Sequence, residues 1–436
     1  MSSTLIWVAG AVLVVAAVSR RLSGTPLTPA MVFVALGVLS GPAVLDLVTD
    51  APTSATVRTF AEATLALVLF ADASRINVAV LRRESALPVR LLGVGLPLTI
   101  ALGALLAKAL FPSLTVAEAL LLAVVLAPTD AALGQAVVTE PRLPIRIRQG
   151  LNVESGLNDG ICVPLLFIVL AWAETEADTT SHHALTIIAE EIGYGILGGA
   201  VSGVAVSAIV LVAARRELIT TPWLGVIPVG GAALAYGIAA ALGGSGFIAA
   251  FLAGGIFGAL AGRHGEQAAP FIEQAGNLLN ATTFVLFGAV LLGPALTHLT
   301  WPIAAYTVLS LTLARMVPVA IALIGTGARR RTVDFLGWFG PRGLASIVFA
   351  VIIVEESNLP HLNTILVTTY AAVGLSVFAH GLTAAPLADR YAGWYESHPG
   401  GAQPPMESAP TTAHRLRGHA RADVALRPPA PPSGTS

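Results

Sequence analysis

Thirteen apolar runs, each separated from the next by polar residues, occupy most of this 436-residue chain. A helix needs about 20 apolar residues to cross a bilayer core about 30 Å thick, and most of the runs are about that long. Only 11% of the residues are charged, whereas soluble domains carry about 25%. We therefore expect an all-α polytopic membrane protein with about thirteen transmembrane helices. The predicted spans are residues 4–18, 28–49, 57–77, 86–110, 116–139, 144–173, 184–213, 221–241, 245–262, 271–294, 302–325, 332–354 and 363–388.

The composition excludes several other classes of protein. The single cysteine, Cys162, permits neither an intrachain disulfide nor a cysteine metal cluster. A net charge of −1 argues against a generic nucleic-acid binder. Lys108 is the only lysine, and the chain has no GxxxxGK, HExxH or GxSxG motif. We therefore expect neither ATP hydrolysis nor a cofactor.

The distribution of arginine orients the chain. Fifteen arginines fall in alternate loops, and the opposite loops and helix ends carry only Arg58 and Lys108. We do not expect the first span to be a cleaved signal peptide, because no basic residue precedes it in this sequence. We expect a plasma (inner) membrane protein with its N-terminus outside and its C-terminus in the cytoplasm. The arginines assigned to the cytoplasmic side are Arg20, Arg21, Arg75, Arg82, Arg83, Arg90, Arg142, Arg146, Arg148, Arg215, Arg216, Arg263, Arg329, Arg330 and Arg331.

The chain changes composition near residue 391. From there to residue 436 it is rich in Pro, Gly, Ser and Ala, a composition that cannot bury a core. We expect a transmembrane domain over residues 1–390 and a disordered cytoplasmic tail over residues 391–436.

Charged residues inside the predicted spans are candidates for function, because charge is costly in the bilayer. Three carboxylates and two arginines fall at similar depth, so their formal charge sums to −1. One uncompensated negative charge in a low dielectric needs a proton or a cation. The five residues are Asp130 in the fifth span, Glu154 and Asp159 in the sixth, Arg315 in the eleventh and Arg342 in the twelfth.

The spacing in the sixth span separates two pairs of residues. Residues four apart share a helix face, which pairs Ser155 with Asp159 and Glu154 with Asn158. A hydroxyl and a carboxylate supply oxygen ligands for a hard monovalent cation. Glu154 and Asn158 are better placed to hold a neighbouring arginine.

The fifth and twelfth spans contain helix breakers at similar depth. Pro128 removes an amide hydrogen bond in the fifth span, and Gly340, Pro341 and Gly343 surround Arg342 in the twelfth. These spans occupy corresponding positions if spans 1–6 and 8–13 are inverted repeats linked by the seventh. Interrupted spans in corresponding positions indicate the binding site of a secondary transporter.

Several of these residues also fit structural roles. Glu154, Arg315 and Arg342 could form ion pairs that only hold helices together. Asp72 lies three residues before Arg75, so it fits a solvated helix end as well as a site. We expect His380 to make a satisfied polar contact. We expect the GxxxG spacings Gly195/Gly199 and Gly254/Gly258 to pack helices closely.

The strings "APTDAALGQAVV", "NVESGLNDG", "LTLARMVPV" and "FGPRGLASIVFA" occur in this order on the fifth, sixth, eleventh and twelfth spans. With them the sequence resembles the monovalent cation:proton antiporter family, and within it the NhaP-like sodium/proton branch, over about residues 4–388. The "ND" pair, here Asn158 and Asp159, implies electroneutral exchange. The resemblance implies that Asp159 and Asp130 carry the cation, assisted by Ser155, Asn158 and the opened backbone at Thr129.

The resemblance also implies a fold and further roles. Interrupted helices five and twelve would cross at the midplane of an inverted-repeat fold. Spans 4–6 and 11–13 would form a core that moves past a dimerisation part of spans 1–3 and 7–10, in a homodimer. Glu154 would pair with Arg342, and Arg315 would stabilise the crossed helix ends. The family often has an acidic residue near the end of the third span, and Asp72 loosely matches it. The proline that usually follows the fifth-span aspartate in the family is absent here, since Ala131 follows Asp130.

The sequence therefore predicts electroneutral exchange of Na⁺ or Li⁺ for H⁺ by competition at Asp159 and Asp130, and no enzymatic activity. K⁺/H⁺ exchange and electrogenic exchange remain alternatives. An ion channel fits less well, because opposed arginines and carboxylates would obstruct a cation pore. An intramembrane enzyme also fits less well, because no nucleophile or zinc motif accompanies the aspartates.

Overall fold

The structure is a computed structural model that describes residues 2–22, 25–47, 54–76, 86–130, 132–177, 184–398 and 406–408. All regular elements in these ranges are helices. In chain order they are α1 (Ser2–Leu22), α2 (Pro29–Ser40), α3 (Ser54–Arg75), α5 (Ala86–Arg90), the π-helical turn η1 (Leu91–Gly95), α6 (Leu96–Leu110), α7 (Val116–Val125), α8 (Gln135–Val138), α9 (Ile145–Ala177), α10 (Ala184–Arg215), α11 (Thr221–Ala241), α12 (Gly246–Ala261), α13 (Arg263–Leu286), the π-helical turn η2 (Phe287–Leu292), α14 (Gly293–Leu296), α15 (Trp301–Leu311), α16 (Leu313–Ala322), α17 (Arg330–Trp338), α18 (Leu344–Glu356) and α19 (Leu362–Glu396).

The helices follow the apolar runs of the sequence. Each predicted span contains helix, and eight helical stretches in the described residues are long and apolar enough to cross a membrane. The helices α2, α7, α12 and α18 are shorter and apolar, and α3 is 22 residues long but carries charged side chains. The prediction of an all-helical chain is confirmed for the described residues, whereas the number of about thirteen transmembrane helices stays a prediction.

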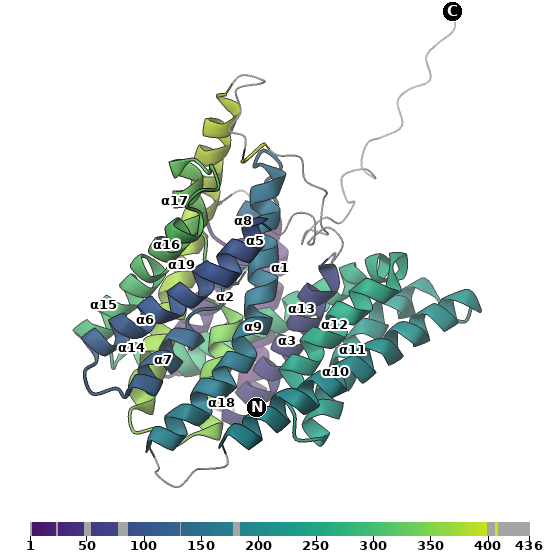
Figure 1. Ribbon diagram of the computed structural model, residues 1–436, viewed down its shortest axis with the longest axis horizontal. Helices are drawn as coiled ribbons and strands as arrows, with labels where there is room; N and C mark the ends of the chain where they lie inside the picture. The colour runs from purple at the N-terminus through teal and green to yellow at the C-terminus, as the bar shows by residue number, and fades with distance from the viewer. Residues whose placement is uncertain are drawn as a thin grey trace, which may run out of the picture.

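The long helix α9 lies between two groups of helices (Figure 1). On one side it contacts α3, α10 and α12, and on the other it contacts α5, α7, α8 and α18. A residue on α9 can therefore face either group, and the buried polar residues of α9 lie where the two groups meet.

Close packing of the first group depends on glycine, as the GxxxG spacings predict. A β-carbon at Gly254 or Gly258 of α12 would lie 2.3 or 2.2 Å from a carbonyl oxygen of α3. A β-carbon at Gly195 or Gly199 of α10 would lie 2.9 or 2.7 Å from a carbonyl oxygen at the beginning of α12. Small residues let helix backbones approach closely in a membrane protein, so larger side chains at these four positions would push the helices apart.

Two of the predicted spans are interrupted where their helix breakers lie. The first break consists of residues 126–130 and 132–134, between α7 and α8, and contains Pro128. The second break consists of residues 339–343, between α17 and α18, and contains Gly340 and Pro341. The missing proline N–H and the steric restriction on the residue before it end a helix. The predicted interruptions are confirmed.

The region predicted as a tail, residues 391–436, begins with helix. The helix α19 continues to Glu396, because the ring of Tyr391 stacks on the ring of Phe335 in α17, with centroids 4.5 Å apart. Residues 406–408 are also described and contain buried side chains. The remainder of the predicted tail lies outside the described residues.

Candidate functional site

The two breaks contact each other through the backbone and through one arginine. The N–H of Asp130 donates to the carbonyl oxygen of Pro341 at 2.7 Å. The guanidinium of Arg342 donates through Nη1 to the carbonyl oxygens of Ala127 and Pro128, the latter at 3.2 Å. Arg342 is 1% exposed, so these carbonyls, which the helix break deprives of helical partners, are satisfied inside the protein.

In the structure, Arg315 makes the contact predicted for Arg342, and Arg342 makes the contact with the helix ends predicted for Arg315. Arg315 on α16, not Arg342, binds Glu154 on α9, through two hydrogen bonds of 2.5 and 2.9 Å. Both residues of this pair are 2% exposed. A β-carbon at Gly340 would lie 2.5 Å from Nε of Arg315, so the glycine makes room for the arginine beside the second break. The predicted Glu154–Arg342 pair is wrong, because the freed carbonyls of the first break bind Arg342 instead.

The carboxylate of Asp130 joins the first break to the beginning of α18. Its Oδ2 accepts the N–H of Leu344 at 3.2 Å, and its Oδ1 accepts the N–H of Ala132 at 2.8 Å. A negative charge at a helix N-terminus is favourable. A β-carbon at Gly343 would lie 2.2 Å from Oδ2, so only glycine allows this approach. Asp130 thus has a structural role as well as its predicted place beside the cation.

Thr129 is held by two side chains of α9. The hydroxyl of Ser155 donates to the carbonyl oxygen of Thr129 at 2.5 Å, and Nδ2 of Asn158 donates to its hydroxyl oxygen at 2.7 Å. Asp159 follows Asn158 directly and is 8% exposed. The structure therefore brings Ser155 and Asn158 of α9 into contact with the opened backbone at Thr129.

Asp72 of α3 also reaches this part of α9. Its β-carbon lies 3.5 Å from where a side chain at Gly156 would begin, and Gly156 is one residue after Ser155. The carboxylate of Asp72 is 3.6 Å from the guanidinium of Arg75, and Asp72 is 14% exposed. Asp72 thus lies beside the turn of α9 that carries Ser155 and also beside Arg75, and its predicted role in the site stays a prediction.

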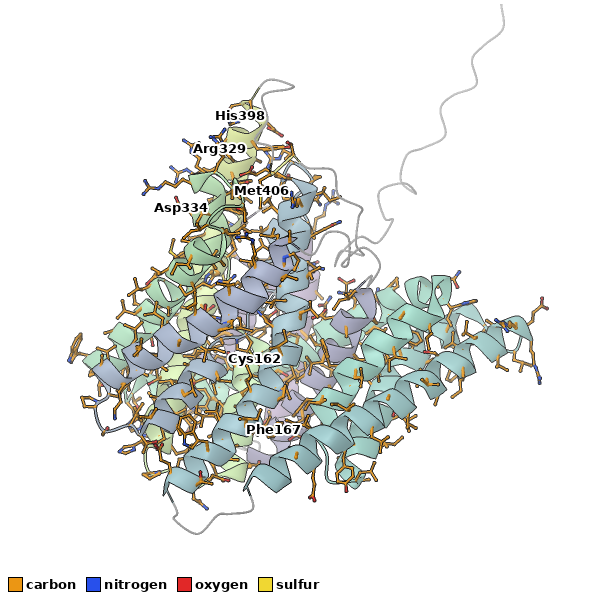
Figure 2. All side chains as sticks on the ribbon, viewed as in Figure 1. Cys162, Phe167, Arg329, Asp334, His398 and Met406 are labelled. Carbon is orange, nitrogen blue, oxygen red and sulfur yellow. The ribbon has the colours of Figure 1, made fainter. Side chains whose placement is uncertain are left out.

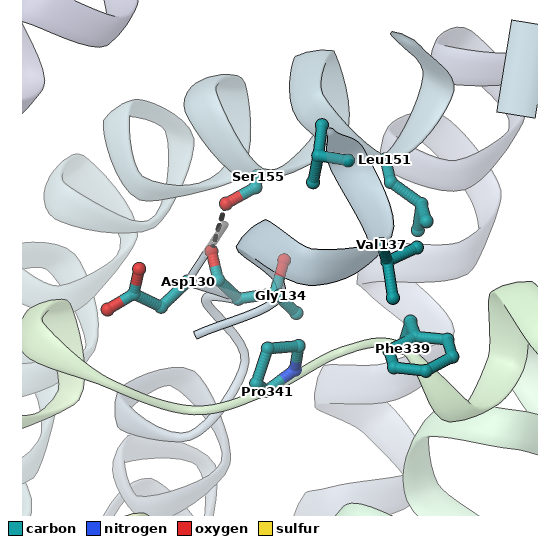
Figure 3. A pocket seen from close by; sticks show the side chains of 9 residues that line it. Asp130, Gly134, Val137, Leu151, Ser155, Phe339 and Pro341 are labelled. Carbon is teal, nitrogen blue, oxygen red and sulfur yellow. Dashed lines mark hydrogen bonds between the residues drawn. The ribbon is translucent and has the colours of Figure 1, made fainter. Parts of the chain in front are cut away.

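A pocket opens beside these residues (Figure 3). Its empty volume is about 280 Å³, including the solvent at its mouth. Its polar lining comes from Thr129, Asp130 and Ser155, and its apolar lining includes Leu151 and Phe339. Since Leu151 lies on α9 between Arg148 and Ser155, the pocket extends toward the arginine-rich end of that helix. Thr129 and Asp130 of the first break and Ser155 of α9 thus line one pocket with an open mouth.

Small hydroxyl residues that the sequence analysis missed support the two breaks. The hydroxyl of Ser346 donates to the carbonyl oxygen of Val125, the last residue of α7, at 2.7 Å. The N–H of Arg342 donates to the hydroxyl of Ser376 at 2.6 Å. His380 lies with its ring nitrogens 3.0 Å from the carbonyl oxygens of Ser376 and of the last residue of α17, which confirms the predicted satisfied polar contact. A lone hydroxyl in an apolar helix gives no sequence signal of its partner.

Salt bridges between side chains outside the predicted spans hold the loop before α9. Arg142 binds Glu140 with Nε 2.8 Å from the carboxylate, and it also binds Asp389 of α19. The hydrogen bond from Arg142 holds the pKa of Glu140 below its usual value, although burial partly opposes this shift. The same contacts raise the pKa of Arg142. This cluster ties the beginning of α9 to α19.

A helical membrane protein in which two interrupted helices meet beside buried carboxylates has the construction of a secondary transporter. The profile of the family described as "Sodium/hydrogen exchanger, transmembrane" matches residues 8–390. The chain belongs to this family of cation/proton antiporters, whose members are transporters rather than enzymes. The resemblance to NhaP-like antiporters, predicted from four motifs, is confirmed.

Characterised relatives differ in the cation that they are named for. The chain is 30% identical to the Na⁺/H⁺ antiporter NhaP of Pseudomonas aeruginosa, over 63% of this chain and 66% of that protein. It is 27% identical to the K⁺/H⁺ antiporter NhaP2 of Shewanella oneidensis, over 74% of this chain and 55% of that protein. The aligned region thus spans between about half and two thirds of these relatives' own lengths.

The fold is shared with a solved antiporter. The structure of the sodium proton antiporter MjNhaP1 from Methanocaldococcus jannaschii superimposes with a TM-score of 0.73 and 19% sequence identity. The superposition covers 90% of this chain and 98% of that one. Together with the membrane-length helices, this likeness establishes a polytopic membrane protein.

Proposed function

We propose that this chain exchanges Na⁺ or Li⁺ for H⁺ electroneutrally across the plasma membrane, by competition of the two ions for a site at Asp159 and Asp130. The observation that carries the proposal is the junction of α9 with the first break. There Ser155 and Asn158 both bind Thr129, and the Asp159 carboxylate is the next side chain along the helix.

One ion pair reduces the number of buried charges that need compensation. The Glu154–Arg315 pair is bidentate and has no net charge, so it does not contribute to the net charge of the site. Asp130, Asp159 and Arg342 remain, with a formal charge of −1. A single proton or a single monovalent cation neutralises this group, and a neutral group crosses a low dielectric at lower cost than a charged one. One-for-one exchange follows if only the loaded forms of the core move.

The proposed cation ligands are oxygens. The Asp159 carboxylate supplies the charge, and the Ser155 hydroxyl and the Thr129 carbonyl supply neutral oxygens, which suit a hard cation. Oδ1 of Asn158 is buried and accepts no hydrogen bond from the described residues, so it is available as a further ligand. Asp72, which faces the same turn of α9, is a candidate additional carboxylate.

The proposed architecture completes the prediction from the motifs. Thirteen spans form inverted repeats, and the interrupted spans, which are α7–α8 and α17–α18, cross at the midplane. The core is α5–α9 with α15–α19, and the dimerisation part is α1–α3 with α10–α14, in a homodimer with its N-terminus outside and its C-terminus inside. The position of α9 in contact with helices of both groups supports this division, because a site on α9 would be carried by motion of one group past the other.

K⁺/H⁺ exchange is the second candidate. The observation that favours it is the alignment with the K⁺/H⁺ antiporter NhaP2 over 74% of this chain, a larger share than with the Pseudomonas relative. Electrogenic exchange would require two protons for each cation, whereas the reduced sum of −1 favours one.

The test is proton movement in proteoliposomes loaded with a pH-sensitive dye. The membrane potential is held at zero by valinomycin with equal K⁺ on both sides, and a gradient of Na⁺ or Li⁺ is then imposed. A K⁺ gradient is tested separately without valinomycin. We expect Na⁺ or Li⁺ to drive proton movement at zero potential, and Glu396→Gln, a change at an exposed carboxylate, to leave it intact. Movement driven by K⁺ alone would select the second candidate, and no coupling to any cation would refute exchange.

A further inference from the structure

A short segment beyond α19, residues 406–408, docks onto the end of the molecule where α17 begins. Figure 2 shows Met406 and Arg329 near each other, far from Phe167 at the opposite end. Glu407 is 1% exposed, and its Oε1 accepts the N–H of Arg329 at 3.0 Å and the hydroxyl of Thr332 at 2.5 Å. A buried carboxylate with two such donors is a specific contact, unlike the loose position expected for a solvated tail.

The contact supplies a side-chain hydrogen-bond acceptor at the N-terminus of α17. Arg329 is the N-cap residue of this nine-residue helix, and its own side chain makes no capping hydrogen bond. A helix N-terminus leaves N–H groups without helical partners and favours a negative charge. The carboxylate of Glu407 therefore acts as a cap that arrives from a distant part of the chain. The neighbouring basic side chains of Arg330 and Arg331 further favour an acidic ligand.

The same segment contacts the beginning of α9. The carbonyl oxygen of Met406 accepts a hydrogen bond from Nη1 of Arg146 at 3.0 Å. The side chain of Met406 is 7% exposed and belongs to an apolar cluster that also contains Val137, Leu151 and Phe339. Those three residues line the pocket beside the ion site. The docked segment thus closes the outer end of the cluster whose inner end faces the pocket.

Both helices that the segment touches lead directly to the site. The far end of α17 runs into the second break, which binds Asp130 through Pro341. The helix α9 carries Ser155 and Asp159. Because α17 is only nine residues long, a displacement of its N-terminus is transmitted to the break by a short, stiff element.

We propose that the N-terminus of α17 is a binding site for an acidic residue, occupied by Glu407 of the chain's own tail, and that its occupancy positions α17 and so sets the cation affinity of the exchange site. The proposal rests on the exchange function proposed above. Glu407 is a positioning residue, since it touches neither the ion pocket nor its ligands.

One oxygen of the docked carboxylate is left without a hydrogen-bond donor among the described residues. Oε2 of Glu407 is buried and accepts no hydrogen bond from the described part of the chain. A buried oxygen without a donor costs free energy that offsets part of the gain from the two bonds to Oε1. The unsatisfied oxygen therefore lowers the net free energy of docking, which makes the contact easier for a competing acidic ligand or a change in the tail to reverse.

Docking is measured first, without reference to transport. Met406→Cys introduces a thiol that docking buries, and Cys162, the natural cysteine, is 0% exposed, so labelling by a maleimide reports position 406. Adding Glu407→Ala should increase the labelling rate about tenfold or more, because a charge-assisted hydrogen bond contributes about 1.5–3 kcal/mol and 1.4 kcal/mol is a factor of ten. Adding Glu396→Ala, which removes an exposed acidic residue, should not change it. Equal labelling with and without Glu407 refutes docking.

Transport is then measured with Glu407→Ala in the full chain, reconstituted as before. We expect a higher KM for the cation without a matching fall in kcat, since removal of a positioning contact weakens ground-state binding. Thr332→Val should reproduce the effect, and Thr332→Ser, which keeps the hydroxyl, should not. Faster labelling with unchanged KM would overturn the regulatory proposal and leave exchange intact. Absence of coupled flux in the wild-type chain would overturn exchange itself, and the labelling result would still report docking.

Discussion

Removing one partner of the Glu154–Arg315 pair should strongly destabilise the protein. Each residue is 2% exposed, and two hydrogen bonds of 2.5 and 2.9 Å join the guanidinium to the carboxylate. Arg315→Gln leaves the Glu154 carboxylate buried without its cation, and Glu154→Gln leaves the guanidinium without its anion. Breaking a buried pair in this way costs about 3–5 kcal/mol. The double variant removes both charges together, so it should cost well below the sum of the two single changes.

Cys162 provides the assay. It is the only cysteine and is 0% exposed, so a thiol-reactive fluorophore in detergent reports its exposure as the protein unfolds. The unfolding entropy is about 2.1 cal/mol/K per residue, so in a chain of 436 residues a loss of 1 kcal/mol lowers Tm by about 1 °C. Each single variant should therefore unfold about 3–5 °C below the wild type. Arg142→Gln is the matched control, because Arg142 also pairs with a glutamate but is 46% exposed, and it should shift Tm little.

Two outcomes would refute this reasoning. If either single variant unfolds within about a degree of the control, the pair does not carry the buried charges as the structure indicates. If the double variant loses the sum of the two single losses, the residues act independently and are not partners. In addition, pairing of Glu154 with Arg342 would be restored as an explanation if Arg342→Gln, and not Arg315→Gln, showed coupling to Glu154→Gln.

Three further predictions concern the site and its surroundings. Gly343→Ala places a β-carbon 2.2 Å from Oδ2 of Asp130, so coupled proton flux should fall about tenfold or more through loss of the charge-assisted bond to α18, while the protein still inserts and purifies. Ser155→Ala should raise the KM for the cation with some exchange surviving, and unchanged KM would remove the hydroxyl from the site. The pKa of Glu140 is lowered from 4.5 by Arg142, so its contribution to stability is present above pH 4.5 and is lost as the pH falls through the lowered value. Glu140→Gln should therefore lower Tm at neutral pH by only a small amount, similar to Arg142→Gln, because the pair is partly exposed, and it should have no effect in strong acid; an equal shift at both would contradict the linkage.

Hydropathy and helix breakers predict much of the architecture. The apolar runs locate the helices because a span must bury about 20 apolar residues. Pro128 and Pro341 indicate the two breaks because proline lacks the N–H of a helical hydrogen bond, and at Pro341 the neighbouring glycines disfavour helix as well. The four motifs identify the family, since they combine charge and helix breaking at one depth. These features are local in the sequence, and local physics governs them.

The partners of buried charges could not be predicted in the same way. Spacing along a helix gives the depth of Arg315 and Arg342, but it does not give their direction around the helix axis or the distance between helices. For that reason the sequence predicts the wrong arginine as the partner of Glu154. The role of Asp130 at the N-terminus of α18 depends on Gly343, whose missing β-carbon acquires meaning only when the two breaks meet. Glu407 lies in a stretch whose composition indicates disorder, and only the tertiary contact with α17 shows its burial.

Competition of a cation and a proton for Asp159 is the central claim, and Asp159→Asn tests it most directly. The variant is expressed to the wild-type level in everted membrane vesicles, a proton gradient is established, and Na⁺ or Li⁺ is added while a pH-sensitive dye is followed. The side chain keeps its size and loses its titratable charge, so cation-induced dequenching should disappear while the initial proton gradient still forms. Dequenching equal to that of the wild type would contradict the assignment of the exchange site to Asp159.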